Sequence, residues 1–120
     1  MARYSQQSLF DFITYEDIFV NEKRSFAQSV AHAAAFTDDN YTGVEVDLDC
    51  IEHTLSSALT PSGIGSLHAR QFVSFAGAHS KAAYLHICEG ATQLADGRKQ
   101  ESTGKLISYL VSDFIKNLQA

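Results

Sequence analysis

The stretch Gly43-Val44-Glu45-Val46-Asp47-Leu48-Asp49 alternates apolar and acidic side chains. Successive side chains of a β-strand point to opposite faces, so this pattern predicts a strand with one apolar and one acidic face. We expect Asp47 and Asp49 to project the same way, roughly 6.6 Å apart. At an effective dielectric constant of about 20, two charges at this distance repel each other by about 2.5 kcal/mol. In a parallel sheet that is covered on both faces, the two aspartates need a cation, and a divalent metal is suited to this role. On an edge strand, the two aspartates are simply solvated.

Around this strand, the spacing of apolar residues predicts a second strand and three helices. The second strand spans residues 82–88, and the helices span residues 23–36, 66–78 and 103–118. Ser66 is expected to cap the N-terminus of its helix. Residues 50–65 and 91–101 are expected to be loops. Strands separated by helices imply parallel pairing through right-handed crossovers, and hence an α/β fold.

The N-terminal segment lacks a clear period. Residues 1–22 mix aromatic and polar side chains, and we expect them to be irregular apart from short extended pieces at 10–13 and 18–20. No repeat or linker divides the chain. We therefore expect residues 1–120 to form a single partial domain, with residues 23–120 as its α/β part.

The composition excludes several classes of protein. The chain has 120 residues, of which 45% are apolar and 19% are charged, as in an ordinary globular protein. Its net charge of −5 and its scattered Lys and Arg residues argue against a surface for nucleic acids or anionic membranes. No signal peptide or membrane span is recognisable, and Cys50 and Cys88 do not form a disulfide framework. We expect a cytoplasmic protein with reduced thiols.

Acidic residues end both predicted strands. Asp47 and Asp49 close the first strand, and Glu89 follows the second. Ligands of open parallel sheets bind beyond the carboxyl ends of the strands, where these carboxylates are expected to meet. The sequence therefore favours a site for a metal or a cationic substrate at this edge.

These residues also carry a resemblance to a known family. Val46-Asp47-Leu48-Asp49, then Thr60-Pro61, then a strand that closes at Glu89 resemble the C-terminal part of the arginase, agmatinase and formimidoylglutamase (ureohydrolase) family. The resemblance runs from about residue 24 to the C-terminus, and residues 45–63 are most similar to the formimidoylglutamase-like branch. It implies the C-terminal portion of a three-layer α/β/α sandwich with a parallel sheet.

The resemblance also implies an activity. Family members hydrolyse a guanidinium or amidine carbon with two Mn²⁺ ions and a bridging hydroxide. Asp47 and Asp49 match metal ligands, Glu89 matches the catalytic glutamate that binds the cationic substrate group, and Thr60 matches a threonine near the substrate. The local similarity favours formimidoylglutamate over arginine, agmatine or guanidinobutyrate as the substrate. The family also tends to form homo-oligomers.

The chain departs from the family pattern in its upstream motifs. The Gly-Gly-x-His and Asp-Ala-His-x-Asp motifs, which supply the other metal ligands, are missing, and Glu45 stands where the family has Ser or Thr. We therefore expect the chain to be part of a longer hydrolase and to be inactive alone. Two alternatives remain: a metal-free hydrolase with Asp47 or Asp49 and Glu89 as an acid–base pair, and a non-catalytic α/β interaction module or degenerate relative.

Other polar and aromatic residues receive structural interpretations. His53 is expected to be a solvated loop residue, and His86 a hydrogen-bonded core residue. Cys50 and Cys88 are expected to be small buried residues. The role of Glu45 stays open. Tyr84 and Tyr109 are expected to be packing residues. The apolar stripe of the last helix is expected to belong to the core, and it consists of Leu106, Ile107, Leu110, Val111, Phe114, Ile115 and Leu118.

Overall fold

The computed structural model describes residues 10–38, 40–79 and 81–118. By its internal contacts the chain divides into two compact units, Met1–Tyr41 and Thr42–Ala120. The single partial domain over residues 1–120 stays a prediction.

The first unit contains two helical elements. A π-helix η1 spans Glu16–Val20, and the helix α2 spans Phe26–Phe36. The extended piece predicted at 18–20 is therefore wrong, and residues 10–14 form no regular strand. Helix α2 begins later than predicted because Ser25 caps it: the Ser25 hydroxyl accepts a 3.0 Å hydrogen bond from the Gln28 N–H. The Gln28 side chain in turn accepts a 2.9 Å bond from the Ser25 N–H.

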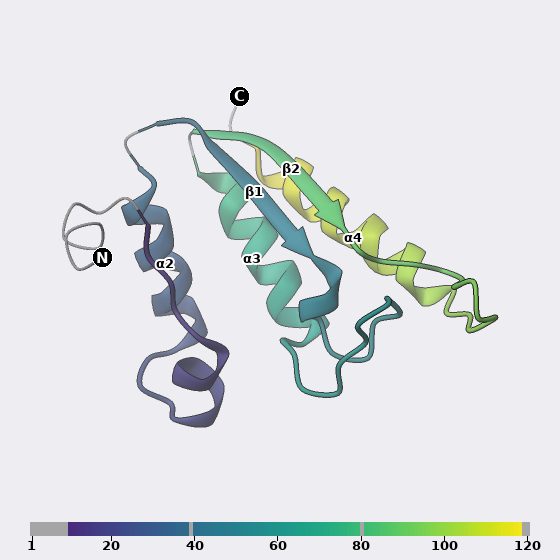
Figure 1. Ribbon diagram of the computed structural model, residues 1–120. Helices are drawn as coiled ribbons and strands as arrows, with labels where there is room; N and C mark the ends of the chain where they lie inside the picture. Colours follow the sequence, from purple (N-terminus) through teal and green to yellow (C-terminus); the bar gives the residue numbers. More distant parts are fainter. Residues whose placement is uncertain (1–9, 39, 80, 119–120) are drawn as a thin grey trace. The chain divides into compact units, whose positions relative to one another are not determined.

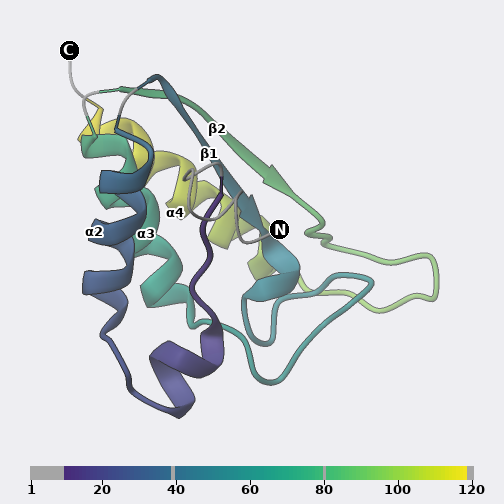
Figure 2. The same cartoon turned by 60° about the vertical axis from the view of Figure 1, so that its left-hand side comes forward.

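The second unit confirms the predicted α/β class. It consists of β1 (Thr42–Asp47), the 3₁₀ turn η2 (Leu48–Cys50), α3 (Ser66–Ala78), β2 (Ala82–Cys88) and α4 (Ser102–Asn117). Strands β1 and β2 pair in parallel, and α3 forms the crossover between them. Figures 1 and 2 show α3 and α4 on the same side of the strand pair, with both long loops leaving from the end to which the arrowheads point.

The core lies between the strand pair and these two helices. The apolar side chains of β1 point into it, as the alternation in the sequence predicts. Gly77 of α3 lies so close to α4 that an added Cβ would be 2.5 Å from the backbone oxygen of Phe114. The buried cluster consists of Val44, Val46, Leu48, Ile51, Ala69, Val73, Leu110 and Phe114.

The N-cap of α3 and the stripe of α4 differ from expectation in detail. Gly65, not Ser66, is the N-cap of α3, and Ser66 is its first helical residue. The α4 stripe is only partly core, because Leu110 and Phe114 are buried whereas three of its members are exposed. A stripe this wide exceeds the surface that α3 and β2 offer. The exposed members are Val111, Ile115 and Leu118.

No helix in the described part of the chain is long and apolar enough to cross a membrane.

Candidate functional site

The register of the sheet brings the predicted carboxylates to one edge. Asp47, the last residue of β1, is the ladder partner of Cys88, the last residue of β2. Glu89 follows directly, so Asp47 and Glu89 leave the same edge one residue apart in register. The sequence predicted this proximity of the two strand ends correctly, because carboxyl ends of parallel strands meet at one edge.

The alternation in the sequence predicted that the strand continues to Asp49, but the strand is shorter. It ends at Asp47, whose carboxylate Oδ1 accepts a 2.9 Å hydrogen bond from the Asp49 N–H. This side-chain bond to the backbone two residues on competes with the extended ladder and starts the turn η2. The expectation that both aspartates project from one strand face is therefore wrong, although Leu48 is buried as expected.

Asp49 contains the atom that best fits a bound cation. Its Oδ1 is buried and has no hydrogen-bond partner within the described residues. A buried carboxylate oxygen without a partner is costly, and a hard divalent cation would satisfy it. Asp47 is exposed and keeps its Oδ2 free of the turn bond. No third His, Cys, Asp or Glu joins them into a group that could hold a metal, as far as the chain is described. The two carboxylates thus fit part of a metal site.

Glu89 adopts a backbone conformation that is rare for a side chain of its type. Its φ is +69°, in the left-handed region. Such conformations cost about 1–2 kcal/mol in non-glycine residues and cluster at functional sites. The next residue, Gly90, lies directly on Leu48, since an added Cβ would overlap the Leu48 side chain. The Glu89 carboxylate is exposed and makes no ion pair with any described residue.

A hydrogen-bonded clamp holds the loop after Asp49 against the chain after Glu89. The Ala91 N–H donates a 3.0 Å bond to the Leu55 carbonyl. The Gln100 side chain accepts a 2.6 Å bond from the Leu55 N–H and donates a 2.8 Å bond to the His53 carbonyl. Thr103 donates to the same Gln100 oxygen at 3.0 Å. Sequence reasoning missed Gln100, because nothing in a polar loop marks a residue that bonds to chain far away.

Thr60 lies in a turn of the same loop. Its hydroxyl accepts a 3.1 Å bond from the Ser62 N–H, and its carbonyl accepts a 2.9 Å bond from the His53 N–H. Its contact with a substrate stays a prediction. His53 is exposed in the loop, as expected, with φ of +59°.

The sheet face opposite α3 and α4 carries a polar cluster of three residues. Glu45 accepts a 2.6 Å hydrogen bond from His86 Nδ1 and a 2.9 Å bond from the Tyr84 hydroxyl. The bond from His86, and then that from Tyr84, lowers the pKa of the Glu45 carboxyl. The pKa of the Tyr84 hydroxyl is raised, because Glu45 favours its protonated form. The cluster gives Glu45 a partner, and it corrects two predictions: His86 and Tyr84 are exposed, not core.

Two cysteines flank the site. Partial loss of hydration next to the surrounding protein raises the pKa of the Cys50 and Cys88 thiols, and the nearby Asp47 carboxylate raises it further. A raised pKa keeps a thiol protonated and unreactive near neutral pH. Cys88 is half-buried, whereas Cys50 is exposed, contrary to the expectation that both are buried.

No protein-family model matches the sequence, and no curated protein matches it. The fold is similar to that of arginase from Bacillus subtilis, with a TM-score of 0.73 at 13% identity over 95% of this chain and 40% of that chain. Entamoeba histolytica arginase in complex with L-ornithine gives a TM-score of 0.72 at 19% identity over 95% of this chain and 38% of that chain. At such identities the similarity establishes an arginase-like fold. The chain spans about two fifths of the length of these arginases.

Proposed function

We propose that the chain carries part of the active site of a metal-dependent hydrolase that cleaves a guanidino or amidine C–N bond. The observation that carries this proposal is the buried, unpartnered Oδ1 of Asp49, beside Asp47 at the sheet edge from which Glu89 also leaves. An arginase-like fold supports the same reaction class. The resemblance of residues 45–63 favours formimidoylglutamate as the substrate.

In this proposal Asp47 and Asp49 donate carboxylate oxygens to Mn²⁺. The turn bond from the Asp49 N–H holds the Asp47 Oδ1 and leaves its Oδ2 for the metal. Oxygen ligands suit hard cations such as Mn²⁺. Mn²⁺ held there would lower the pKa of a bound water enough to give hydroxide at neutral pH. The remaining ligands come from the rest of a longer protein, so the chain alone is expected to be inactive.

Glu89 is proposed as the residue that binds and orients the substrate. Its carboxylate offers two oxygens to the planar N–H fork of a guanidinium or formamidinium group. It is unpaired within the described residues, and the backbone bond from Ala91 to Leu55 fixes the chain that follows it. A cation held this way has its reacting carbon in a fixed position relative to the metal ligands. Thr60 is proposed to lie beside the same substrate.

A second candidate is a non-catalytic interaction module. It is favoured by one observation: within the described residues only two carboxylates meet at the proposed metal site, without a third ligand. Under this hypothesis the acidic edge is merely solvated. Replacing either aspartate by asparagine would then leave the function unchanged.

The first experiment is intact-mass measurement and top-down sequencing of the native protein from its source cells. A longer chain with upstream His and Asp motifs supports the hydrolase, whereas a mass that matches this chain favours the interaction module. The whole protein is then assayed for formamide release from formimidoylglutamate and urea release from arginine, with and without Mn²⁺. Activity that survives a chelator would favour the metal-free acid–base hydrolase.

Variants of the whole protein complete the test. Asp47→Asn and Asp49→Asn should abolish activity and lower the number of bound Mn²⁺ ions, measured by elemental analysis. Asp96→Asn, in the loop after β2, is the matched control and should retain both. Unchanged metal content in the first two variants would overturn the ligand assignment. From the family resemblance we propose a homo-oligomer, and from the two cysteines without a disulfide framework a cytoplasmic location. Native mass spectrometry of the same sample tests the assembly.

A further inference from the structure

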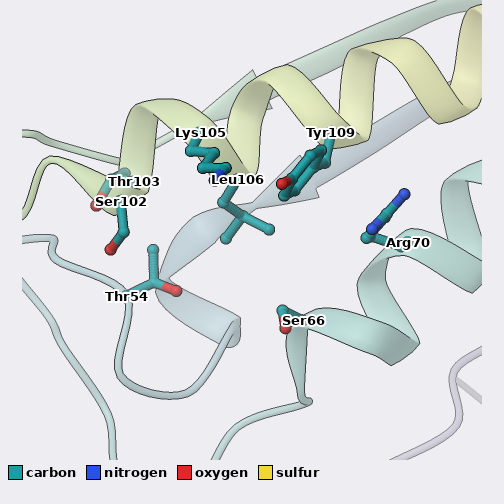
Figure 3. Close-up of a pocket in the computed structure, with 8 residues that line it drawn as sticks. All are labelled: Thr54, Ser66, Arg70, Ser102, Thr103, Lys105, Leu106 and Tyr109. Atoms are coloured by element: carbon teal, nitrogen blue, oxygen red, sulfur yellow. The ribbon is translucent and has the colours of Figure 1, made fainter.

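A cavity lies between the N-terminal halves of α3 and α4. Its volume is about 300 Å³, within the range of small-molecule pockets. Figure 3 shows residues of α4 on one side and Thr54 and Ser66 across from them. It contains none of the residues that the proposed hydrolase site uses. Its lining consists of Thr54, Ser66, Arg70, Ser102, Thr103, Lys105, Leu106 and Tyr109.

The charge of this lining is positive. Arg70 and Lys105 contribute cations, and no carboxylate lines the cavity, although the whole chain has a net charge of −5. Arg70 is held by Asp113, which accepts bonds of 2.6 Å and 3.0 Å from its guanidinium. Lys105 has no acidic partner within the described residues, and its ammonium lies 5.8 Å from the centre of the Tyr109 ring. An unbalanced cation therefore remains at the cavity.

Hydroxyl groups line the same cavity. Thr54 is buried, with only 5% of its surface exposed. Its hydroxyl donates one weak hydrogen bond, to the Glu52 carbonyl at 3.5 Å. In Figure 3 this hydroxyl faces the cavity. The hydroxyls of three further lining residues make no hydrogen bond within the described part of the chain. These are Ser66, Ser102 and Tyr109.

We propose that this cavity binds the phosphate group of a small phosphate monoester. The cavity offers four hydroxyl donors and one ammonium group. A planar carboxylate has too few acceptor sites to use all of these donors. A phosphate group can, because its oxygens accept hydrogen bonds from several directions. The Leu106 side chain and the Tyr109 ring supply an apolar wall for the organic part of the ester. The proposal does not depend on the hydrolase function.

The test is an NMR titration of the ¹⁵N-labelled full chain with phenyl phosphate, inorganic phosphate or sodium acetate at constant ionic strength. We expect saturable amide shifts confined to the first turns of α3 and α4 and to Thr54, with phenyl phosphate binding more tightly than inorganic phosphate. Lys105→Gln should weaken phenyl phosphate binding about tenfold, as the loss of one charge-assisted hydrogen bond. Lys116→Gln, on the same helix outside the cavity, is the matched control and should bind as the unmodified chain does. Ser102→Ala gives a second, smaller perturbation within the cavity.

Three results would overturn the proposal. The first is the absence of saturable shifts at these residues with phenyl phosphate. The second is an equal loss of affinity in Lys105→Gln and Lys116→Gln, which would indicate unspecific attraction to positive charge. The third is acetate or inorganic phosphate binding as tightly as phenyl phosphate, which would exclude a site built for a phosphate monoester.

Discussion

The side chain of Gln100 accepts a 2.6 Å hydrogen bond from the backbone N–H of Leu55, 45 residues earlier in the chain. Leu55 is buried, so its N–H has no access to water in place of this bond. The same side chain donates to the His53 carbonyl. One glutamine thus holds the loop between Asp49 and α3.

Gln100→Ala is expected to destabilise the fold by about 2 kcal/mol, because a buried N–H loses its only acceptor. Chemical denaturation of the variant and the unmodified chain measures this difference. Gln93→Ala, in the same loop and exposed, is the control and should change the free energy of unfolding by less than about 0.5 kcal/mol. Equal effects of the two substitutions would contradict the clamp.

Two helical glycines should respond in opposite directions to alanine. A Cβ at Gly77 would be 2.5 Å from the Phe114 backbone oxygen, so Gly77→Ala must push α3 and α4 apart. We expect a loss of about 1–3 kcal/mol, as for other overpacked cores. A Cβ at Gly104 would meet only Thr92 at 3.7 Å, an ordinary contact. Gly104→Ala should therefore stabilise the chain by about 0.5–1 kcal/mol through helix propensity. Thermal unfolding distinguishes the two.

The left-handed backbone at Glu89 predicts a difference between two substitutions that both remove its carboxylate. Glu89→Gly relieves the unfavourable φ of +69°, whereas Glu89→Ala retains it. The glycine variant should be more stable than the alanine variant by about 1 kcal/mol, measured by chemical denaturation. Both should abolish the proposed substrate binding in the whole protein. If the alanine variant were the more stable one, no strain would be stored at this position.

The polar cluster on the outer sheet face predicts a pH dependence. The pKa of Glu45 is lowered first by the His86 bond and second by Tyr84, so it lies below the value in the unfolded chain. The stabilisation from Glu45 is then fully present above the unfolded-state pKa and is lost as the pH falls through the lower, folded-state pKa. NMR titration of the Glu45 carboxyl should show its pKa rising in His86→Gln, and rising less in Tyr84→Phe. A larger rise in Tyr84→Phe would reverse this order of causes.

Local patterns in the sequence predicted the elements that are determined locally. The bounds of α3 and β2 agree with the structure, because their apolar periods and flanking breaks are short-range signals. The end of β1 was wrong, because alternation alone does not reveal that the Asp47 carboxylate bonds to the backbone of Asp49. The outer part of the α4 stripe was assigned to the core, since a sequence does not state how much surface will cover a helix.

The candidate site likewise has features that the sequence predicted and features that it did not. The meeting of Asp47 and Glu89 follows from a general rule of parallel sheets and was predictable. The burial of the Asp49 oxygen, the Gln100 clamp and the pairing of Glu45 with His86 depend on contacts between residues far apart in sequence. A single sequence does not encode these pairings in any local pattern.

The crossover through α3 has a consequence for the order of folding. The ladder joins Glu45 to His86, 41 residues apart, so strand pairing must first overcome the entropy of closing that segment. Helix α3 forms within the segment and shortens the distance to be closed, so we expect it to precede the ladder. Since Asp47 and Glu89 are brought together only by this ladder, we expect the edge that bears them to be completed after α3 has formed.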